Sequence, residues 1–599
     1  MQNFKTNINE ICEFKLPINY LSNVYELDNN LIQDLELNQF SNIENIENIE
    51  NIENKENKEN KENKEQCVYD YIYSPSCNFS RNSMIDSIKY YTNDTIYLKE
   101  TQKLLLTYKN YNNDNNDIID ICNSEIENSW NEIINNKSFI DKYHYININF
   151  LKFFNYNSLC LHFLSLYNIS SPFLSIVLPV FILIIPYFIL KLQGQIINFD
   201  TYKRLLCVII QKQSMGKMLF NFANSSIDKK VQALFCIIFY FLQIWNNFYV
   251  CTSFYKNMNY VSKQINLFKQ YLNNSLIKIN NFLKYSSDLK TYESFNNDLE
   301  YIKENINIYL NKLNIVKKYK YNIFNLNQIG LLMSQYYNIY DCKNTQNIFT
   351  YIFNFNGYIE NITHIKLLID NNYIHACKFN KKQTKFNKMF YPPLLKKSPV
   401  KNSYNLSKNM IITGPNASGK TTLLKSTLIN LILSQQIGFG FYKSAYINPY
   451  KYIHCYINIP DTSGRDSLFQ AEVRRCKDIL NIIDENKKQR HFCIFDELFS
   501  GTNPYEAVSC AQSYLKYLSK NNNINLMLTT HYIDLCKNLN TNNNIKNYHM
   551  KINKTNNNFV YTYLLNKDIS TFKGGIKILK DFDYPEEIIE ESQKIINNY

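Results

Sequence analysis

The sequence contains no CxxC pair, and its 15 cysteines are scattered over 599 residues. Cys493 lies inside the apolar run HFCIF, which we expect to be buried. An odd number of dispersed cysteines argues against a disulfide framework and indicates reduced thiols that face the cytoplasm. The first 20 residues also lack the apolar core of a signal peptide, so no secretory leader is predicted.

Strong charge of one sign is also missing. The net charge of +13 is small for 599 residues, and the excess of Asn, Lys, Ile and Tyr is what an A/T-rich genome encodes. We interpret it as a solvated lysine surface rather than as a nucleic-acid site. Because one hydrophobic core rarely serves more than roughly 250–300 residues, we expect several domains.

Composition divides the chain into five segments. The first ends in the repeat NIENIENIENIENKENKENKENKE, which has almost no core-forming residues and predicts disorder. A mostly helical region, a membrane-associated segment, a helical core or lever with a linker, and an alternating α/β domain follow. The five predicted segments are 1–66, 67–165, 166–251, 252–400 and 401–599.

The longest apolar run has no charged residue between 172 and 190. Its length is close to the roughly 20 residues that a helix needs to cross a bilayer. Pro179 and Pro186 are tolerated in membrane helices, where neighbouring groups satisfy the freed backbone. We predict a transmembrane helix here, with a buried core helix as the alternative.

A second apolar stretch at 231–250 is interrupted by Gln243, Asn246 and Asn247. Three interpretations stay open for it: a second span, an interfacial helix or a buried core helix. The basic segment between the two stretches favours a cytoplasmic position for that segment and therefore a single span. The flank after residue 250 is equally basic, so the sequence leaves the topology open.

Helical periodicity dominates residues 252–325. Apolar side chains recur at steps of three and four, which places each set on one face of a helix. The two predicted helices pair as an antiparallel, coiled-coil-like hairpin, and they are either a lever or part of an ordinary bundle. The two sets are Val261, Ile265, Phe268, Leu272, Leu276, Ile279 and Leu283, and Leu299, Ile302, Ile306, Tyr309, Leu313 and Val316.

Residues 414–421, GPNASGKT, match the pattern GxxxxGK[ST] of a phosphate-binding loop. A short apolar strand precedes them and an amphipathic helix follows. In such a loop the backbone N–H groups face phosphates at a helix N-terminus. Lys420 is then expected to neutralise the β- and γ-phosphates, and Thr421 to bind Mg²⁺. The predicted cofactors are ATP and Mg²⁺.

Two further strands deliver polar residues at their carboxyl ends. HFCIF is followed by Asp496 and Glu497, and INLMLTT is followed by His531. Asp496 is expected to hold Mg²⁺ through a coordinated water, and Glu497 to polarise the attacking water. His531 is expected to sense the γ-phosphate.

A turn of small residues precedes an amphipathic helix between these motifs. It contains Ser463, Gly464 and Ser467. A Gly/Ser turn at a helix start binds anions, but it also caps ordinary helices. Beside the other motifs, it predicts the element that closes across a dimer on the γ-phosphate held by the partner subunit.

The order and spacing of these motifs resemble the MutS family of DNA mismatch-repair ATPases. TGPNASGKTT is similar to the family's TGPNxxGKST, FDELFSGTNPYEA to DEIGRGTSTxDG, and TTHYIDL to ATHYxEL. The segment from YTYLLNKDIS to PEEIIEES resembles the family's closing stretch. The resemblance covers residues 385–599.

The resemblance implies an α/β P-loop NTPase of the ABC type, a homodimer formed through this domain, and DNA as a partner. It makes Glu497 and His531 catalytic, and Thr421 and Asp496 the Mg²⁺ ligands. The implied nucleotide contacts are Gly414, Pro415, Asn416, Ala417, Ser418, Gly419, Lys420, Thr421, Thr422, Gly464 and Ser467.

The chain departs from the family in three ways. The serine turn at 463–469 is one residue longer than the family's SGRSTF, so either Ser463 or Ser467 fills the role. Gly501-Thr502-Asn503-Pro504 replaces GTST. The N-terminal half has no mismatch-reading Phe-x-Glu and no clamp, and an apolar segment stands in their place, as in divergent MutS relatives of large DNA viruses.

Two functions follow as hypotheses. The first is a MutS-like dimeric ATPase that couples ATP to DNA binding in repair or replication-associated maintenance. The second is a membrane-anchored, ATP-driven switch or tether without a DNA role. A third hypothesis, an ABC transporter, is disfavoured because one or two spans make no transport pathway and an LSGGQ-type signature is absent. We expect a membrane-associated protein whose ATPase domain faces the cytoplasm.

Overall fold

The computed structural model describes residues 13–37, 67–109, 123–192, 194, 198–212, 226–316, 328–457, 459, 467–555, 558–570, 579 and 582–598. The chain forms two compact units. Unit 1 comprises Met1–Cys12, Asn115–Ile277 and Ile302–Ile352, and unit 2 comprises Glu13–Asp114, Lys278–Tyr301 and Phe353–Tyr599.

A six-stranded sheet is the centre of unit 2, and five of its strands are parallel. The antiparallel β13 closes one edge. Strands β10 and β11 are buried almost throughout, as expected for parallel strands covered on both faces. The order is β13 (Asn558–Lys567), β12 (Ile545–Thr555), β6 (Asn409–Thr413), β11 (Ile524–Thr530), β10 (His491–Asp496) and β9 (Tyr452–Tyr456).

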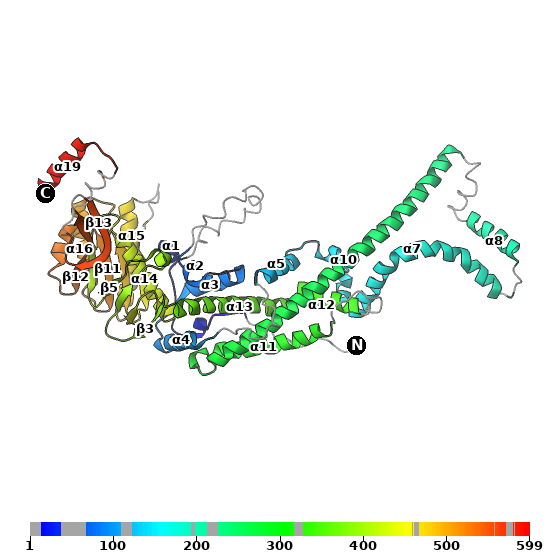
Figure 1. Cartoon of the computed structure of the whole chain (residues 1–599), viewed down its shortest axis with the longest axis horizontal. Helices are drawn as coiled ribbons and strands as arrows, with labels where there is room; N and C mark the ends of the chain where they lie inside the picture. Colours follow the sequence, from blue (N-terminus) through cyan, green and yellow to red (C-terminus); the bar gives the residue numbers. More distant parts are fainter. Residues whose placement is uncertain are drawn as a thin grey trace. The chain divides into compact units, whose positions relative to one another are not determined.

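Helices alternate with these strands along the chain (Figure 1). Asn503 caps one of them by accepting a hydrogen bond from Glu506 N, and Pro504 occupies its first turn. The helices are α14 (Lys420–Gln436), α15 (Leu468–Glu485), α16 (Pro504–Leu518), α17 (Ile533–Leu539) and α19 (Glu586–Asn598). This alternation agrees with the α/β domain predicted for 401–599.

A five-stranded sheet also belongs to unit 2. Its order is β5 (Asn402–Asn405), β4 (Lys385–Met389), β8 (Ser444–Ile447), β3 (His375–Phe379) and β7 (Phe439–Gly440). The 3₁₀ helix η7 (Pro392–Lys397) lies between β4 and β5 in the chain. This sheet begins before residue 401, so strand structure starts earlier than the predicted domain boundary.

Residues 13–37 are ordered, which differs from the predicted disorder of 1–66. They form η1 (Pro17–Tyr20), β1 (Val24–Glu26) and α1 (Asn29–Asp34), and β1 pairs with β2 (Tyr90–Thr92). Their leucines are buried, which gives the segment the core that the repeat lacks. Residues 38–66, which contain most of that repeat, lie outside the described residues.

Three helices accompany this N-terminal segment in unit 2: α2 (Asp70–Tyr73), α3 (Asn78–Lys89) and α4 (Thr95–Thr107). Charged side chains attach α1 to the α/β domain. Asp28 Oδ2 lies 3.3 Å from Arg475 Nη1, and Glu36 Oε1 lies 2.7 Å from Lys425 Nζ.

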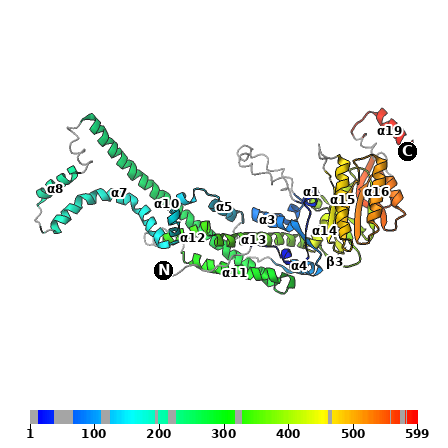
Figure 2. The same ribbon diagram turned by 180° about the vertical axis from the view of Figure 1, so that it is seen from behind.

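Unit 1 is helical. It contains α5 (Asn123–Ile134), α6 (Phe139–Lys142), η4 (Asn149–Tyr156), α7 (Ser158–Leu192), α8 (Phe199–Lys212) and α12 (Ile329–Asp341). Its core is aromatic: the Phe139 and Tyr340 rings stack 4.0 Å apart, and Phe349 contacts Trp130 and Phe268. Figure 2 shows these helices from behind.

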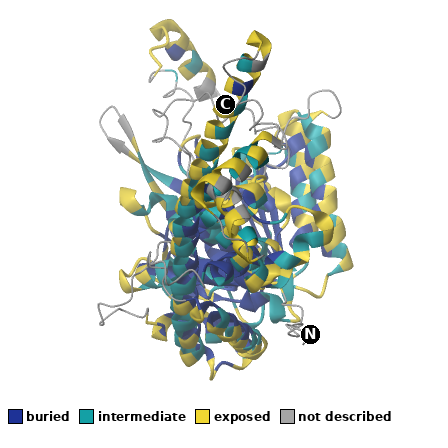
Figure 3. Cartoon of the chain, turned by 90° about the vertical axis from the view of Figure 1, so that its right-hand side faces the viewer, coloured by how far each residue is buried: buried dark blue, intermediate teal, exposed yellow. Residues whose placement is uncertain are grey.

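Three long helices contribute residues to both units: α10 (Ile227–Ser286), α11 (Glu293–Asn314) and α13 (Lys343–Asp370). The 3₁₀ helix η5 (Lys290–Tyr292) joins the first two. The predicted apolar faces are confirmed, because most members of both sets are buried and only Leu276 and Leu283 are half-buried. Figure 3 shows the buried residues gathered on the strands and on the packed sides of the helices.

Candidate functional site

The loop between β6 and α14 curls around its own lysine. Lys420 Nζ donates hydrogen bonds to the carbonyl oxygens of Gly414 and Pro415 at 3.0 and 3.2 Å. Gly419, the N-cap of α14, has φ +90°, and Ala417 has φ +59°. These left-handed conformations bend the backbone toward the N-terminus of α14, which is where an anion is stabilised.

Beside this loop lies a cavity of about 570 Å³. Its size falls within the range of small-molecule sites, roughly 300–1,000 Å³. The chain before β6, the loop with α14, and the β12–β13 hairpin all contribute to its walls. The lining residues are Met389, Phe390, Tyr391, Leu394, Val400, Asn402, Asn416, Ala417, Ser418, Gly419, Lys420, Thr421, Thr422, Leu423, Ser426, Glu497, Met550 and Tyr563.

Three oxygen-bearing side chains meet at the carboxyl end of β10. Thr421 Oγ1 donates a hydrogen bond to Asp496 Oδ2 at 2.7 Å, and Thr529 Oγ1 donates to Asp496 Oδ1. Among the described residues, no group of three or more His, Cys, Asp or Glu side chains forms a complete metal cage. Mg²⁺ suits such a site, because it takes one or two protein oxygens and completes its shell with phosphate and water.

Glu497 lies beyond Asp496 in a left-handed conformation, with φ +52°. Its backbone N–H donates to Thr529 O at 3.1 Å, which anchors the residue to β11. Its Oε1 atom lies 3.0 Å from His531 Nε2, and the same nitrogen lies 3.0 Å from Lys420 Nζ. The site therefore brings the predicted base, the predicted sensor and the loop lysine into contact.

Burial and neighbouring charges set the protonation of two of these groups. Burial lowers the pKa of Lys420, and the Glu497 and Asp496 carboxylates oppose that change. The hydrogen bond from His531 lowers the pKa of Glu497, although partial burial raises it. Glu497 is thus ionised at neutral pH and able to accept a proton.

Ser418 fits the expectation of a phosphate-facing loop. Its Oγ atom is buried and has no hydrogen-bond partner among the described residues. A buried hydroxyl without a partner costs free energy, so the loop has a donor available for an anion. Asn416, Ala417 and Thr422 also line the cavity and are exposed.

The serine turn is placed differently. Ser467 is the exposed N-cap of α15: its Oγ accepts from Gln470 N at 3.3 Å, while Gln470 Oε1 accepts from Ser467 N at 3.0 Å. Ser467 does not line the cavity formed by its own chain. Ser463 and Gly464 lie outside the described residues.

A buried carboxylate ties α15 to the loop that follows Glu497. Glu472 is 2% exposed, and its Oε1 accepts from Ser500 N and Ser500 Oγ, both at 3.0 Å. Its Oε2 accepts from Gly501 N at 3.1 Å. The helix that begins at Ser467 and the loop after the base are therefore held together by three hydrogen bonds.

Sequence reasoning missed several contributors to this region, among them Thr529, Tyr563, Met550 and Glu472. Thr529 could have been found from the sequence, because it is one of two threonines at the end of the predicted strand INLMLTT, where the other site residues were expected. Tyr563 and Met550 come from a hairpin more than 100 residues away, and only tertiary structure brings them to Gly419.

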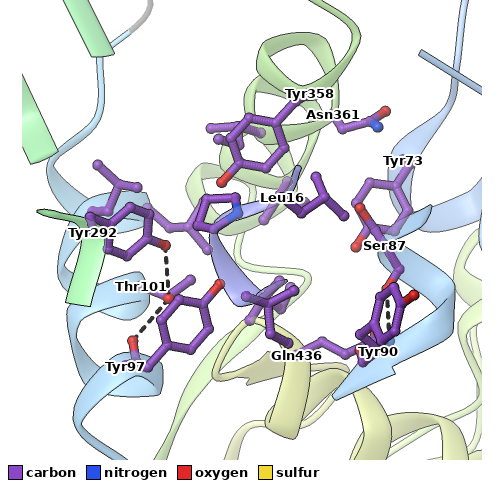
Figure 4. A pocket seen from close by; sticks show the side chains of 17 residues that line it. Leu16, Tyr73, Ser87, Tyr90, Tyr97, Thr101, Tyr292, Tyr358, Asn361 and Gln436 are labelled. Atoms are coloured by element: carbon purple, nitrogen blue, oxygen red, sulfur yellow. Dashed lines mark hydrogen bonds between the residues drawn. The ribbon is translucent and has the colours of Figure 1, made fainter. Parts of the chain in front are cut away.

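Another cavity in unit 2 is much smaller, about 50 Å³ (Figure 4). Tyrosines and aliphatic side chains line it, and Leu16 lies on one wall. Gln436 at its edge donates to the carbonyls of Ser87, Ile88 and Tyr90 and accepts from Tyr69 Oη, so its polar groups are satisfied. Its size and lining suit packing rather than nucleotide binding.

Comparisons with known proteins point to the same region. The family model for MutS domain V matches residues 410–599. The DNA mismatch repair protein MutS of Aquifex pyrophilus is 29% identical over 187 residues, which are 31% of this chain and 21% of that protein. The protein of the same name from Prochlorococcus marinus (strain AS9601) is 30% identical over 192 residues, 32% of this chain and 21% of that protein.

A third relative, the DNA mismatch repair protein MutS of Bacteroides fragilis (strain YCH46), is 27% identical over 239 residues. These residues are 38% of this chain and 27% of that protein. The chain therefore spans between 21% and 27% of the length of these relatives. Lys420, Asp496, Glu497 and His531 all lie within the residues that the family model matches.

Proposed function

The chain is a divergent member of the MutS family through residues 410–599, and from this premise we propose that it binds ATP with Mg²⁺ and hydrolyses it. One observation carries the proposal. Lys420, Thr421, Asp496, Glu497 and His531, from three separate parts of the chain, converge beside the 570 Å³ cavity. Parallel α/β sheets bind ligands at this carboxyl edge.

The P-loop fold and the role of each residue are part of the proposal. The loop 414–421 would hold the phosphates through its N–H groups and through Lys420, whose present carbonyl contacts a phosphate would replace. Thr421 and Asp496 would hold Mg²⁺, which supplies charge neutralisation on the phosphates when bound.

Glu497 is the proposed general base. Its carboxylate is ionised, lies at the cavity and is oriented by His531, so it would accept the proton of the attacking water. Because His531 Nε2 contacts both Glu497 and Lys420, the ring would report occupation of the lysine to the base.

We propose a homodimer in which each α15 N-terminus completes the partner's site. Ser467 is exposed and absent from its own cavity, as an element that acts on a second copy must be. Gly464 would contact the nucleotide from the same turn. A two-fold dimer places the same pair of surfaces at both sites.

ATP hydrolysis in this chain would be coupled to DNA binding, as the relatives' name, DNA mismatch repair protein, suggests. The mismatch-reading motif is missing from the sequence, so we propose DNA maintenance without mismatch selection by this chain alone. DNA contact through phosphates would weaken steeply with salt.

A second candidate function is a membrane-anchored, ATP-driven switch or tether without a DNA role. Two helices, Ser158–Val177 within α7 and Lys230–Ser286 within α10, are long and apolar enough to cross a membrane by length and composition. Within the second helix, the 18-residue apolar stretch that identifies it as a candidate span has no buried residue, whereas the core helix of a soluble protein is mostly buried. We propose membrane attachment in either case, with the ATPase domain on the cytoplasmic face.

Steady-state ATP hydrolysis by the full chain in detergent tests the first function against the second. The rate is measured without DNA, with homoduplex and with mismatched duplex, at low and moderate salt, and Glu497→Gln serves as the control. Stimulation by DNA that disappears with salt supports the DNA-coupled ATPase. Hydrolysis that needs Glu497 but ignores every DNA supports the membrane switch, and no hydrolysis at all contradicts both.

A further inference from the structure

We propose that α7 and α10 cross a lipid bilayer as two antiparallel spans, so that α8 lies on the opposite face from α12. This inference rests on the membrane attachment proposed above. It adds the number of spans, their direction and the level at which the bilayer begins. All of the segments involved belong to unit 1.

Near Phe254, helix α10 changes from mostly exposed apolar side chains to a buried apolar stripe. Residues 231–255 contain no charged side chain. Their large apolar residues are exposed, for example Phe235 at 67%, Phe239 at 74% and Trp245 at 76%. From Phe254 onward, the same helix shows a buried stripe that continues through Met258 and Val261. One continuous helix is thus packed in protein at one end and uncovered at the other.

Helix α7 makes the same change in the opposite direction. Its first part packs on α12 so closely that a Cβ on Gly330 would lie 2.1 Å from Ser158 O. Leu161 and Ser165 are buried there. Beyond Pro172 most of the described apolar side chains are exposed, with Phe173 at 66% and Phe188 at 57%.

Two contacts show that both changes occur at one level. Cys251 Sγ lies 3.6 Å from Ile169 O, and Tyr240 Oη donates to Ser175 O at 2.8 Å. As the chain advances along α7 it retreats along α10, so the two helices are antiparallel. Both pass from the packed to the uncovered state beside the Ile169–Cys251 contact, and they diverge toward α8 (Figures 1 and 2).

The uncovered lengths match a bilayer. From Lys230 to Phe254 a helix rises about 36 Å, and from Pro172 to Lys191 about 28 Å, at about 1.5 Å per residue. The hydrocarbon core of a bilayer is about 30 Å thick. Charged residues return at the far end of each helix, at Lys191 and at Lys230.

The distribution of apolar residues favours lipid over a protein partner. Between residues 231 and 253, apart from the buried Ala233 and a half-buried stripe that includes Tyr240 and Cys251, most side chains of α10 are exposed. A protein partner or a second copy requires one apolar stripe, whereas acyl chains require an apolar surface wherever the helix is uncovered. At the far end, exposed Lys191, Lys203 and Arg204 suit anionic lipid headgroups.

This topology opposes the single span that the basic segment between the two stretches favoured in the sequence. The positive-inside rule is a statistical bias, and both flanks here are basic. The contacts between α7 and α10 instead run in antiparallel order along the two helices, which suits two spans.

Cysteine labelling of the full chain tests the topology. Asp200→Cys, on α8, and Tyr505→Cys, on α16, both introduce an exposed thiol. Each is expressed in a bacterial host and treated with a membrane-impermeant maleimide in spheroplasts and in inverted inner-membrane vesicles. Both substitutions are made in a Cys510→Ser chain, because Cys510 is an exposed native thiol on the same helix as Tyr505. This parent chain measures labelling of the remaining native cysteines.

We expect one introduced cysteine to be labelled only in spheroplasts and the other only in inverted vesicles, at least tenfold above the Cys510→Ser parent chain. Labelling of both from the same face overturns the two-span topology but leaves membrane attachment intact. Release of the chain by sodium carbonate at high pH overturns attachment itself. If the released chain is a dimer, a second copy covers these helices instead of lipid.

Discussion

His531 Nε2 lies 3.0 Å from Glu497 Oε1 and 3.0 Å from Lys420 Nζ. One neutral ring nitrogen cannot donate to a carboxylate and accept from an ammonium group at the same instant. With its proton on Nε2 the ring holds Glu497, and with its proton on Nδ1 it accepts from Lys420. The His531 ring thus contacts both Lys420, the proposed phosphate-binding group, and Glu497, the proposed base.

Replacing His531 with alanine should move the acid limb of the pH–rate profile to higher pH. The hydrogen bond from His531 lowers the pKa of Glu497, so the carboxylate stays ionised below the usual range. Without that donor the pKa rises, and because only the ionised form accepts a proton, the rate falls at a higher pH. The measurement is kcat between about pH 4 and pH 8, where carboxylates titrate.

Glu497→Gln is the matched control for this experiment. It should reduce kcat by about 10²–10⁴-fold at every pH, the usual contribution of a general base. An acid limb that stays in place in the His531 variant would contradict the proposed contact between the two side chains.

Thr421→Ala should raise the Mg²⁺ concentration needed for half-maximal hydrolysis by about 10–100-fold. Thr421 Oγ1 lies 2.7 Å from Asp496 Oδ2, so removal of the hydroxyl takes away one of two adjacent oxygens. Thr421→Ser keeps the hydroxyl and should behave as the unsubstituted chain. Equal Mg²⁺ dependence of the alanine and serine variants would remove Thr421 from the metal site.

That Lys420, Asp496 and His531 come together could be predicted from the sequence for a physical reason, while their roles stay predictions. Asp496 ends β10, His531 directly follows β11, and Lys420 opens α14 after the loop that follows β6. Parallel strands bring their carboxyl ends to one edge of the sheet, so these three residues come together there. At this edge, the local sequence pattern of a strand followed by a polar residue is enough to predict the position, because the parallel sheet fixes where the strands end. Tyr563 and Glu472 reach the same region only through long-range packing, which no local spacing encodes.

The N-terminal part shows the opposite case. Residues 13–37 were predicted as disordered with the repeat behind them, but Leu31 and Leu35 are buried and Asp28 reaches Arg475 across more than 400 positions. That segment is therefore stabilised by contacts with residues that are remote in sequence. Composition averaged over a window hides a few buried leucines beside a polar repeat.

Mixing two inactive variants should restore activity if Ser467 acts across a dimer. Lys420→Ala removes the phosphate contact, and Ser467→Ala removes the hydroxyl offered to the partner. In a mixed dimer, one site combines the intact Lys420 of one subunit with the intact Ser467 of the other. Random exchange makes half of the dimers mixed, with one good site each, so about a quarter of the original rate should return.

The measurement is hydrolysis after the two variants are mixed and allowed to exchange subunits. Each variant mixed with itself gives the background, and Lys420→Ala mixed with Glu497→Gln is the matched control, because both lesions lie in the same chain's cavity. If the first mixture gives no more than this control, Ser467 does not complete the partner's site.

Glu472→Gln should lower kcat without an equal change in the half-saturating ATP concentration. Glu472 holds Ser500 and Gly501 in the loop that follows the base, and Glu497 and Phe499 are both left-handed in that loop, with φ +52° and +60°. In the glutamine variant, an NH₂ group stands where one carboxylate oxygen of Glu472 accepted a hydrogen bond. That hydrogen bond is therefore lost. The loop then loosens around Glu497, while Lys420 and Thr421 keep their own contacts.

A displacement of about 1 Å at a catalytic group costs up to about 10²-fold in rate, so we expect kcat to fall by roughly 10- to 100-fold. Half-saturating ATP should change by no more than about threefold, since phosphate contacts are retained. Asp478→Asn, an exposed carboxylate on the same helix, is the control for a general effect on α15. Equal loss in both variants, or a Glu472 variant that merely unfolds by circular dichroism, would reduce Glu472 to a stabilising residue. A selective loss of kcat in a folded protein would make it the group that positions the base.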